Sequence, residues 1–453
     1  MGINRFLAVE HANEDFRIPR RLYAILESLI AKGPTGEEYQ LRMDGVDADW
    51  FDDNGQRVVD DGYFEQAPLY VIEADLPVRL PCELHAEASP LRDEHPGRWL
   101  EVHILPRHSS PIAADLFGNL YQGEARSISF HAHRLPSFAA RELMRVFSFN
   151  DVPSASAGQL GAVLARLGGI EGVGVYDVGQ GSCAAGLADN GEARAYFDMG
   201  CGVFRNVATV PAALTAVCLP PDAPVVLSHW DADHWALAHR FLTQRDDALA
   251  RDWIAPRQKV GPTHIAFARR IRARGRLLLW PRRLPSIARG GCLVEKCQGV
   301  GRNESGLAVT VTRNAQAVLF PGDAGYASIP SAASTTLAAV VVPHHGGLTV
   351  PSHTPPCPGR GTERALYSYG PGNSYRHPLQ TVESDHDAAG WLHKCLSGPP
   401  DLTRRTAVRA ASGLGHIGYF FGRTPVTPLA SPCQTCSYRG SLPGRCRMDI
   451  QTT

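Results

Sequence analysis

The sequence predicts an α/β protein with more than one domain, and three observations support this. The chain has 453 residues, of which 44% are hydrophobic and 20% charged, which is ordinary globular composition for two or three domains. Short apolar stretches separated by glycine-rich turns predict strands throughout the second part of the chain. Leu160, Val163, Leu164 and Leu167 have helical spacing and precede Gly168-Gly169, so a helix over 156–167 marks the boundary between two domains.

Residues 1–168 are expected to form an N-terminal accessory domain of the α+β type. Leu22, Ile25, Leu29 and Ile30 follow helical spacing, which predicts a helix over 20–31. Two stretches rich in β-branched and aromatic residues predict strands over 68–80 and 99–105. No known catalytic motif is evident in this region, so its role is open. It is a candidate surface for a regulatory protein partner.

Residues 169–425 are expected to form a second domain rich in strands. The first two strands are predicted over 173–178 and 193–199, paired as a hairpin, and a helix over 378–396. Further strands are predicted over 225–228, 307–312, 317–320, 339–342, 366–369, 406–410 and 416–421. The last part of the chain, 426–453, is a cysteine-containing tail.

The charge and the N-terminal residues say little about partners. The formal net charge is zero and the pI is about 7.3, so global charge indicates no preference for nucleic acid. The N-terminus lacks the apolar run of a signal peptide, and no stretch approaches the roughly 20 apolar residues that a bilayer helix needs. We therefore expect a cytoplasmic protein without a membrane partner. In a reducing compartment most of the 11 cysteines would be small buried residues.

The most informative segment is an apolar strand that ends in closely spaced metal-ligand residues. The strand over 225–228 leads directly into His229-Trp230-Asp231-Ala232-Asp233-His234. Alternate residues of a strand point the same way, so His229 and Asp231 can converge. Imidazoles and carboxylates that converge in this way are typical of a divalent metal site. The alternative is a helix start capped by one aspartate, which would need a single acid only.

This segment resembles the metal-binding motif of the metallo-β-lactamase superfamily, in particular its competence-protein (ComEC-type) branch, whose hydrolase domain is attached to bacterial DNA-uptake channels. The third position of the motif is an aspartate in that branch, as in this sequence. Six further segments resemble branch motifs and follow in the same order, so that the resemblance covers about 171–425; they are 177–182 (DVGQGS), 196–200 (YFDMG), 303–305 (NES), 319–323 (LFPGD), 342–346 (VPHHG) and 373–378 (NSYRHP). The resemblance implies a metallo-β-lactamase αββα sandwich, with two mixed β-sheets flanked by helices.

The sequence departs from the branch at two positions. Ser182 stands where the branch usually has an aspartate after Gly-Gln-Gly, so any role of that aspartate does not carry over. Trp235-Ala236 replaces the Gly-Gly that often follows the Asp-His pair. A multi-pass membrane region is not evident, so a transport role does not carry over either.

The resemblance and the spacing together imply two divalent metal ions, zinc or manganese. We expect His229 and Asp231 to bind one ion and Asp233 and His234 to bind the other. Asp323 is expected to bridge the two ions, although an aspartate after Pro-Gly is also common in simple turns. One residue of the pair His344 and His345 is expected to reach the site.

Asp233 is the candidate catalytic residue, placed to orient or deprotonate the attacking water. Asp198, Asn303 and His377 are candidates for support of the ligands or for substrate contact, and His377 could equally be a residue at the start of a helix. No serine or cysteine nucleophile is needed.

The resemblance implies a nuclease or phosphodiesterase that uses a metal-activated hydroxide, in bacterial defence or DNA handling. A basic stretch could follow a phosphate backbone, with Trp280 stacked on a base; its candidate contacts are Arg269, Arg270, Arg272, Arg274, Arg276, Arg282 and Arg283. The alternative is a solvated basic helix and loop. Two other functions are open: a small-molecule hydrolase acting on a nucleotide, lactone or thioester, and a regulatory module with a vestigial site.

The tail carries part of a zinc-ribbon pattern. Cys433, Cys436 and Cys446 have the spacing of zinc ligands, and the fourth ligand would have to come from elsewhere in the chain. A structural zinc ion is therefore a candidate at the tail.

Overall fold

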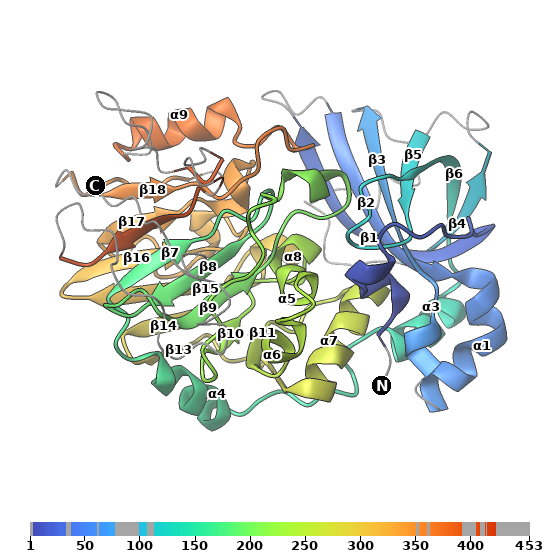
Figure 1. Ribbon diagram of the computed structural model, residues 1–453, viewed down its shortest axis with the longest axis horizontal. Coiled ribbons are helices and arrows are strands. Elements are labelled where there is room, and N and C mark those ends of the chain that lie inside the picture. The colour runs from blue at the N-terminus through green and yellow to red at the C-terminus, as the bar shows by residue number, and fades with distance from the viewer. Residues whose placement is uncertain are drawn as a thin grey trace. The chain divides into compact units, whose positions relative to one another are not determined.

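The computed structural model is a mixed α/β structure, 26% helical and 31% strand (Figure 1). It describes residues 3–32, 38–60, 63–77, 99–106, 113–349, 353–359, 363–391, 405–407, 413 and 415–422. The tail 426–453, the end of the predicted helix over 378–396 and most of the predicted strand over 406–410 lie outside the described residues. The chain divides into two compact units. Unit 1 comprises 1–153, 203–205 and 259–273, and unit 2 comprises 154–202, 206–258 and 274–453.

Unit 1 is built on a closed antiparallel barrel with the strand order β1-β2-β3-β5-β6-β4. Its strands are β1 (Arg21–Lys32), β2 (Glu38–Asp47), β3 (Leu69–Pro77), β4 (Trp99–Leu105), β5 (Ala113–Phe117) and β6 (Arg126–Arg134). Leu22, Met43, Ile72, Leu116 and Phe130 belong to the hydrophobic cluster of the barrel strands. Its helices are α1 (Ala48–Asp60), α3 (Ser137–Val146) and, through Ala273, α7 (Pro262–Arg274).

The predicted helix over 20–31 is wrong, because this segment forms strand β1. The strand pairs with β2 on one side and with β4 on the other. Leu22, Ala24, Leu26 and Leu29 all contribute to the barrel cluster. The pairing with β2 shifts between Leu26 and Ser28, so Glu27 is an extra residue in a β-bulge. The bulge shifts the alternation of β1 by one residue, so Leu22 and Leu29 both face the barrel cluster although they are seven residues apart, a spacing that also fits a helix.

Unit 2 contains two mixed sheets. The seven-stranded sheet has the order β12-β11-β10-β9-β8-β7-β19, and the six-stranded sheet has the order β13-β14-β15-β16-β17-β18. The strands of the first sheet are β7 (Gly172–Val175), β8 (Cys183–Leu187), β9 (Ala193–Met199), β10 (Val225–Val226), β11 (Asp252–Ala255), β12 (Arg276–Leu279) and β19 (Ile417–Phe420). Those of the second are β13 (Ser286–Arg289), β14 (Cys292–Lys296), β15 (Leu307–Arg313), β16 (Gln316–Phe320), β17 (Leu337–Val341) and β18 (Arg364–Leu366).

The two sheets of unit 2 share one hydrophobic core. Val175 and Ile254 from the seven-stranded sheet belong to the same buried cluster as Val309 from the six-stranded sheet. The rings of Phe197 and Phe320, one from each sheet, lie 4.5 Å apart between centroids. The sheets therefore pack face to face, and their strand ends meet along common edges.

Helices cover the outer faces of these sheets. α9 (Gln380–Ala388) packs through Val382 on a buried cluster formed by the six-stranded sheet. Trp253 of β11 donates a hydrogen bond from its indole nitrogen to Ala248 of α6 (Arg245–Leu249) on the other sheet. The remaining α-helices of unit 2 among the described residues are α4 (Ala157–Leu164), α5 (Leu237–Arg240) and α8 (Gly301–Glu304).

Short 3₁₀ helices occur in both units. They lie at Arg5–Leu7, Val9–His11, Tyr63–Gln66, Ala165–Leu167, Phe204–Thr209, Ala232–His234, Tyr326–Ser328 and Pro343–Gly346.

The predicted helix over 156–167 is confirmed as α4 and the turn after it. Ser156 and Gln159 form a capping box at its start. The helix belongs to unit 2, because Leu160, Val163 and Leu164 join the sandwich core, so the N-terminal segment of unit 1 ends at Pro153 and not near residue 168.

The predicted hairpin of 173–178 and 193–199 is wrong, because β8 lies between these two strands in the sheet. Strand β8 has the sequence CAAGL, which lacks the β-branched residues that indicate strands. The other predicted strands within the described residues are found to within a few residues of their expected ends.

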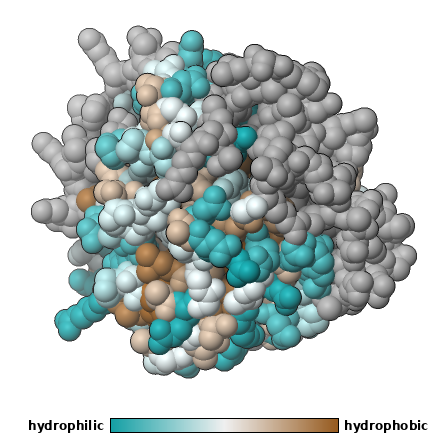
Figure 2. Space-filling model, turned by 90° about the vertical axis from the view of Figure 1, so that its left-hand side faces the viewer, coloured by the Kyte–Doolittle hydropathy of each residue, from teal (hydrophilic) through white to brown (hydrophobic). Residues whose placement is uncertain are grey.

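The surface of the described residues is of mixed character. Hydrophilic and hydrophobic side chains are intermixed among the coloured residues of the face in Figure 2, as is ordinary for globular proteins. Among the described residues, no helix is long and apolar enough to cross a membrane.

His416, just before β19, supports a prediction about acid stability. Its Nδ1 accepts a hydrogen bond from the backbone nitrogen of Asp177 at 2.8 Å, which requires a neutral ring. Burial lowers the pKa of His416 from 6.5 to about 4. The unfolded chain therefore binds this proton below pH 6.5 and the folded chain only below about pH 4, so stability present above pH 6.5 is lost as the pH falls. We expect a loss of about 2 kcal/mol in the free energy of unfolding by pH 5 from this group.

Urea unfolding at pH 7.5 and pH 5 measures this loss. The variant His416→Asn keeps a side-chain acceptor but does not titrate, so its free energy of unfolding should fall less between the two pH values. An equal fall in the variant and in the wild type would contradict the assignment.

Candidate metal centre

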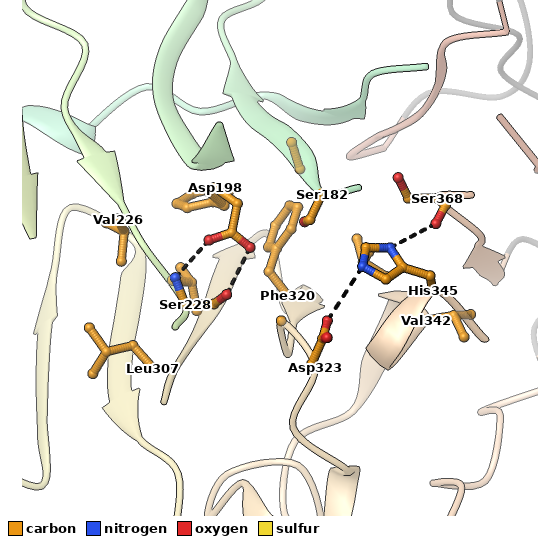
Figure 3. Close-up of a pocket in the computed structure, with 15 residues that line it drawn as sticks. Ser182, Asp198, Val226, Ser228, Leu307, Phe320, Asp323, Val342, His345 and Ser368 are labelled. Atoms are coloured by element: carbon orange, nitrogen blue, oxygen red, sulfur yellow. Dashed lines mark hydrogen bonds and ion pairs between the residues drawn. The ribbon is translucent and has the colours of Figure 1, made fainter. Parts of the chain in front are cut away.

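The predicted ligands lie at strand ends of both sheets in unit 2. Asp198 is the second-to-last residue of β9, and His229 follows β10 in the seven-stranded sheet. Asp323 follows β16, and His344 follows β17 in the six-stranded sheet. Because the sheets pack face to face, these ends meet at one edge, where Figure 3 shows Asp323 facing His345 and Asp198 reaching Ser228.

The two carboxylate oxygens of Asp323 each face a separate set of ligand atoms. Its Oδ1 lies 3.0 Å from Nε2 of His234 and 3.7 Å from Nε2 of His345. The same His345 nitrogen lies 3.4 Å from Oδ2 of Asp233. We call Asp233, His234, His345 and this oxygen the first set.

The second set consists of His229, Asp231, His344 and Oδ2 of Asp323. This oxygen lies 3.7 Å from Nε2 of His229 and 3.8 Å from Nε2 of His344. Nε2 of His229 also lies 3.6 Å from Oδ2 of Asp231. Two atoms bound tetrahedrally to one zinc ion, with bonds of about 2.0–2.1 Å, lie roughly 3.4 Å apart. Most of the separations in both sets exceed a hydrogen-bond length and are close to this spacing.

The central atoms of these sets are buried and have few hydrogen bonds. Within the described chain, Nε2 of His229 and that of His345 have no hydrogen-bond partner, and Nε2 of His234 and Oδ1 of Asp323 have none apart from each other, at 3.0 Å. These residues are between 0% and 4% exposed. Buried polar atoms nearly always have a partner, because leaving one without costs about 1–3 kcal/mol. A bound cation would satisfy all four atoms, so the residues fit a metal centre.

Each of the four histidines has its Nδ1 beside an oxygen acceptor, which leaves Nε2 for a ligand. His345 lies 3.0 Å from the carbonyl of Ser368, and His344 lies 3.0 Å from that of Leu348. A carbonyl only accepts, so Nδ1 carries the proton in both rings and Nε2 presents its lone pair. The structure thus brings both histidines to the centre, whereas one was expected.

Asp198 and Ser228 hold the other two rings. Oδ2 of Asp198 lies 2.8 Å from Nδ1 of His234, and Ser228 donates to both Asp198 oxygens, from its backbone nitrogen at 2.7 Å and from Oγ at 2.8 Å. Oγ of Ser228 lies 3.0 Å from Nδ1 of His229. Asp198 thus lies where sequence reasoning placed it, beside a ligand. Ser228 was missed, although its position directly before the first histidine was a signal.

Asp231 has a partner that sequence reasoning also missed. Nε of Arg302, in α8, lies 2.5 Å from Oδ1 of Asp231, and both side chains are buried. Gln258 donates to the backbone carbonyl of Arg302 at 2.6 Å, and its side-chain oxygen accepts from the backbone of Trp230. The ion pair fixes one oxygen of Asp231 and leaves the other directed at His229.

The remaining two candidates differ in position. Asn303 is half-buried on α8 and belongs to neither set. His377 is buried with its ring centroid 5.3 Å from that of His344, and its Nε2 has no hydrogen-bond partner within the described chain. Burial lowers the pKa of His377 well below its usual value, so the ring is neutral.

Two glycines in the motifs around the centre are required by close contacts with other segments. A Cβ at Gly200 would lie 1.6 Å from the carbonyl oxygen of Asp233, so only glycine allows the two segments to approach. Gly322 has φ +62°, and a Cβ there would lie 2.5 Å from that of Ser228. His344 and His345 also have positive φ values, 50° and 56°, which is strained for residues with a side chain.

The electrostatics link metal binding to protons. Burial would raise the pKa of Asp323, but the neighbouring histidines, His234 first, hold it well below the usual value. Burial would lower the pKa of His234, yet the charges of Asp323 and Asp198 raise it well above the usual value. In the absence of metal the ring of His234 therefore holds a proton that a cation must displace, and acid should weaken metal binding.

The basic stretch does not form an open row of cations. Trp280 is 2% exposed in the sandwich core, so the prediction that it stacks on a base is wrong. Arg270 is 4% exposed, and Arg269 lies over the ring of Phe64. The ion pairs in this stretch are Arg272–Asp151, Arg274–Asp246 and Arg276–Asp252, while Arg282 and Arg283 are exposed. The hydrophobic spacing of α7 did not reveal which of its arginines would be buried or paired.

Comparison with known proteins gives no identification. No family model matches the sequence, and no curated protein is significantly similar to it.

The contact between Asp198 and His234 generates a prediction about metal affinity. We expect Asp198→Ala to weaken metal binding about 10–100-fold, because the ring of His234 loses the acceptor that fixes its tautomer. Competition with a chromophoric chelator measures the affinity. Asp222→Ala, at an exposed position of the same unit, is the matched control. Unchanged affinity in Asp198→Ala, with the fold intact by circular dichroism, would show that Asp198 does not support the centre.

Proposed function

We propose that this protein is a metal-dependent hydrolase of the metallo-β-lactamase fold, related to the competence-type branch, and that it cleaves phosphodiester bonds in nucleic acid. The fold proposal is supported by the face-to-face mixed sheets of unit 2, with α6 and α9 on their outer faces. It is also supported by the order of the motifs, most of which lie at or near strand ends.

The observation that carries the proposal is the pair of ligand sets on either side of the Asp323 carboxylate. We assign Asp233, His234 and His345 to one divalent ion and His229, Asp231 and His344 to the other, with one oxygen of Asp323 for each. Nε2 of His234 has one lone pair and its Nδ1 faces Asp198, so His234 serves one ion only. Each set then has two imidazoles and two carboxylates, which suits zinc or manganese.

The protein residues divide the work of hydrolysis. Two bound cations would lower the pKa of a bridging water and neutralise charge on the phosphoryl group. Asp233 borders this position and orients the attacking water or accepts its proton. Asp198 and Ser228 hold the histidine rings, and Arg302 holds Asp231, so the ligands are preorganised. The complete ligand sets argue against a vestigial site in a regulatory module.

A second candidate substrate class is a small phosphodiester or nucleotide. The pairing of Arg272, Arg274 and Arg276 with aspartates favours it, because paired arginines contribute less to the binding of a long phosphate backbone. Both candidates use the same centre and the same attacking water.

Nuclease activity is tested with the purified full chain on labelled single-stranded DNA, duplex DNA and RNA. The reactions contain manganese, magnesium or zinc, with an EDTA control. We expect cleavage that requires metal, and a loss of about 100-fold or more in Asp233→Asn, because the residue both binds metal and handles the proton. Asp222→Asn, exposed in the same unit, should leave the rate unchanged.

A chromogenic small diester in the same reactions separates the two substrate classes. Cleavage of the diester alone, from protein that holds stoichiometric metal, would replace the nuclease proposal by the second candidate. No metal-dependent cleavage of any of these substrates would overturn both.

A further inference from the structure

We propose that unit 1 holds a divalent cation of its own, bound by Glu27, Asp44 and His264. This inference does not rest on the proposed function, because all three residues belong to unit 1 and none belongs to the hydrolase centre. They come from β1, β2 and α7. One oxygen or nitrogen atom of each lies within 4.8 Å of those of the other two.

The three side chains are buried on the outside of the barrel wall. Leu41 and Met43 of β2 belong to the hydrophobic cluster of the barrel strands, so Asp44, the next residue, lies on the opposite face. The side chains of His264 and Glu27 are 0% and 2% exposed, and Asp44 is 0% exposed. Buried charged groups of this kind are usually paired or bound to a metal.

The bulge in β1 places Glu27. Leu26 pairs with Met43 and Ser28 with Arg42, so Glu27 is the extra residue of the bulge between them. A bulge redirects a side chain at the cost of a ladder position, and bulges are enriched next to functional sites. Here it brings the carboxylate of Glu27 next to the ring of His264.

The start of α7 is shaped to hold Asp44. Thr263 donates two hydrogen bonds to Oδ2 of Asp44, from its backbone nitrogen at 2.9 Å and from Oγ1 at 2.7 Å. A Cβ at Gly261 would lie 2.1 Å from this oxygen, so glycine is needed for the approach. Carboxylates that bind metal are oriented by hydrogen bonds of this sort.

The chemistry of the site indicates which cation it takes. One imidazole and two carboxylates suit zinc or manganese, with water completing the coordination. Nε2 of His264 and Oε1 of Glu27 are in direct contact, and the ion would replace that hydrogen bond. Because the ion must compete with this pairing, we expect weaker binding than at the hydrolase centre. Its effect is structural, since it joins α7 to two barrel strands that lie more than 200 residues earlier.

Metal content measured on a variant that lacks the hydrolase centre tests the proposal. In His229→Ala/His234→Ala/Asp323→Ala, incubated with zinc or manganese and desalted, we expect about one equivalent of metal by native mass spectrometry. Adding His264→Gln should remove it. Adding His133→Gln, an exposed histidine of β6 in the same unit, should not. Retention of the metal in the His264→Gln background would overturn the assignment to these residues.

A further measurement needs no change in the barrel, so it remains decisive if His264→Gln does not fold. In the variant that lacks the hydrolase centre, zinc or manganese should raise the unfolding temperature. If this variant is folded and binds neither metal, the site in unit 1 does not exist, whatever the wild type cleaves.

Discussion

The carboxylate of Asp323 is the group on which the arrangement of the centre depends. It is buried at the end of β16, and the Nε2 atoms of four histidines lie within 3.0–3.8 Å of its two oxygens. Burying one carboxylate among imidazoles costs solvation energy, which the fold can recover only if positive charge is present. A proton on His234 supplies such charge in the free protein, and metal ions would supply it in the loaded protein. The strained backbone at His344 and His345 and the close approach at Gly200 are consequences of collecting these donors at one point.

The supporting contacts are as specific as the ligands. Asp198 has φ 64°, an unusual backbone conformation for aspartate, and from there reaches both Ser228 and His234. Arg302 holds one oxygen of Asp231 while the other stays directed at His229. In each case a neighbour fixes one atom of a ligand and leaves the other for a cation. The centre is thereby preorganised for a cation.

Sequence reasoning pointed to the cluster of ligand residues and to Asp198, but not to its other supports or its surroundings. Residues 229–234 and 323 were found because several donor types at strand ends have few explanations other than metal binding. Ser228 and Arg302 were missed because a serine and an arginine have many roles, and their importance depends on contacts across segments far apart in the chain. The basic stretch was misjudged for the same reason. Charge is visible in a sequence, but the aspartates that pair with Arg272 and Arg276 lie 121 and 24 residues earlier.

The largest error in secondary structure has a more specific cause. The bulge at Glu27 changes the alternation of β1, so its apolar residues imitate a helix. A bulge removes a ladder position, so the formation of the barrel does not by itself explain why this strand is interrupted. The interruption places a carboxylate beside His264 and next to the Thr263–Asp44 contacts, which a regular strand of the same length would not provide. Places where sequence and local structure disagree are often functional. The bulge residue that gives β1 its misleading helical spacing is thus also the one that completes a cluster of metal-ligand side chains in unit 1.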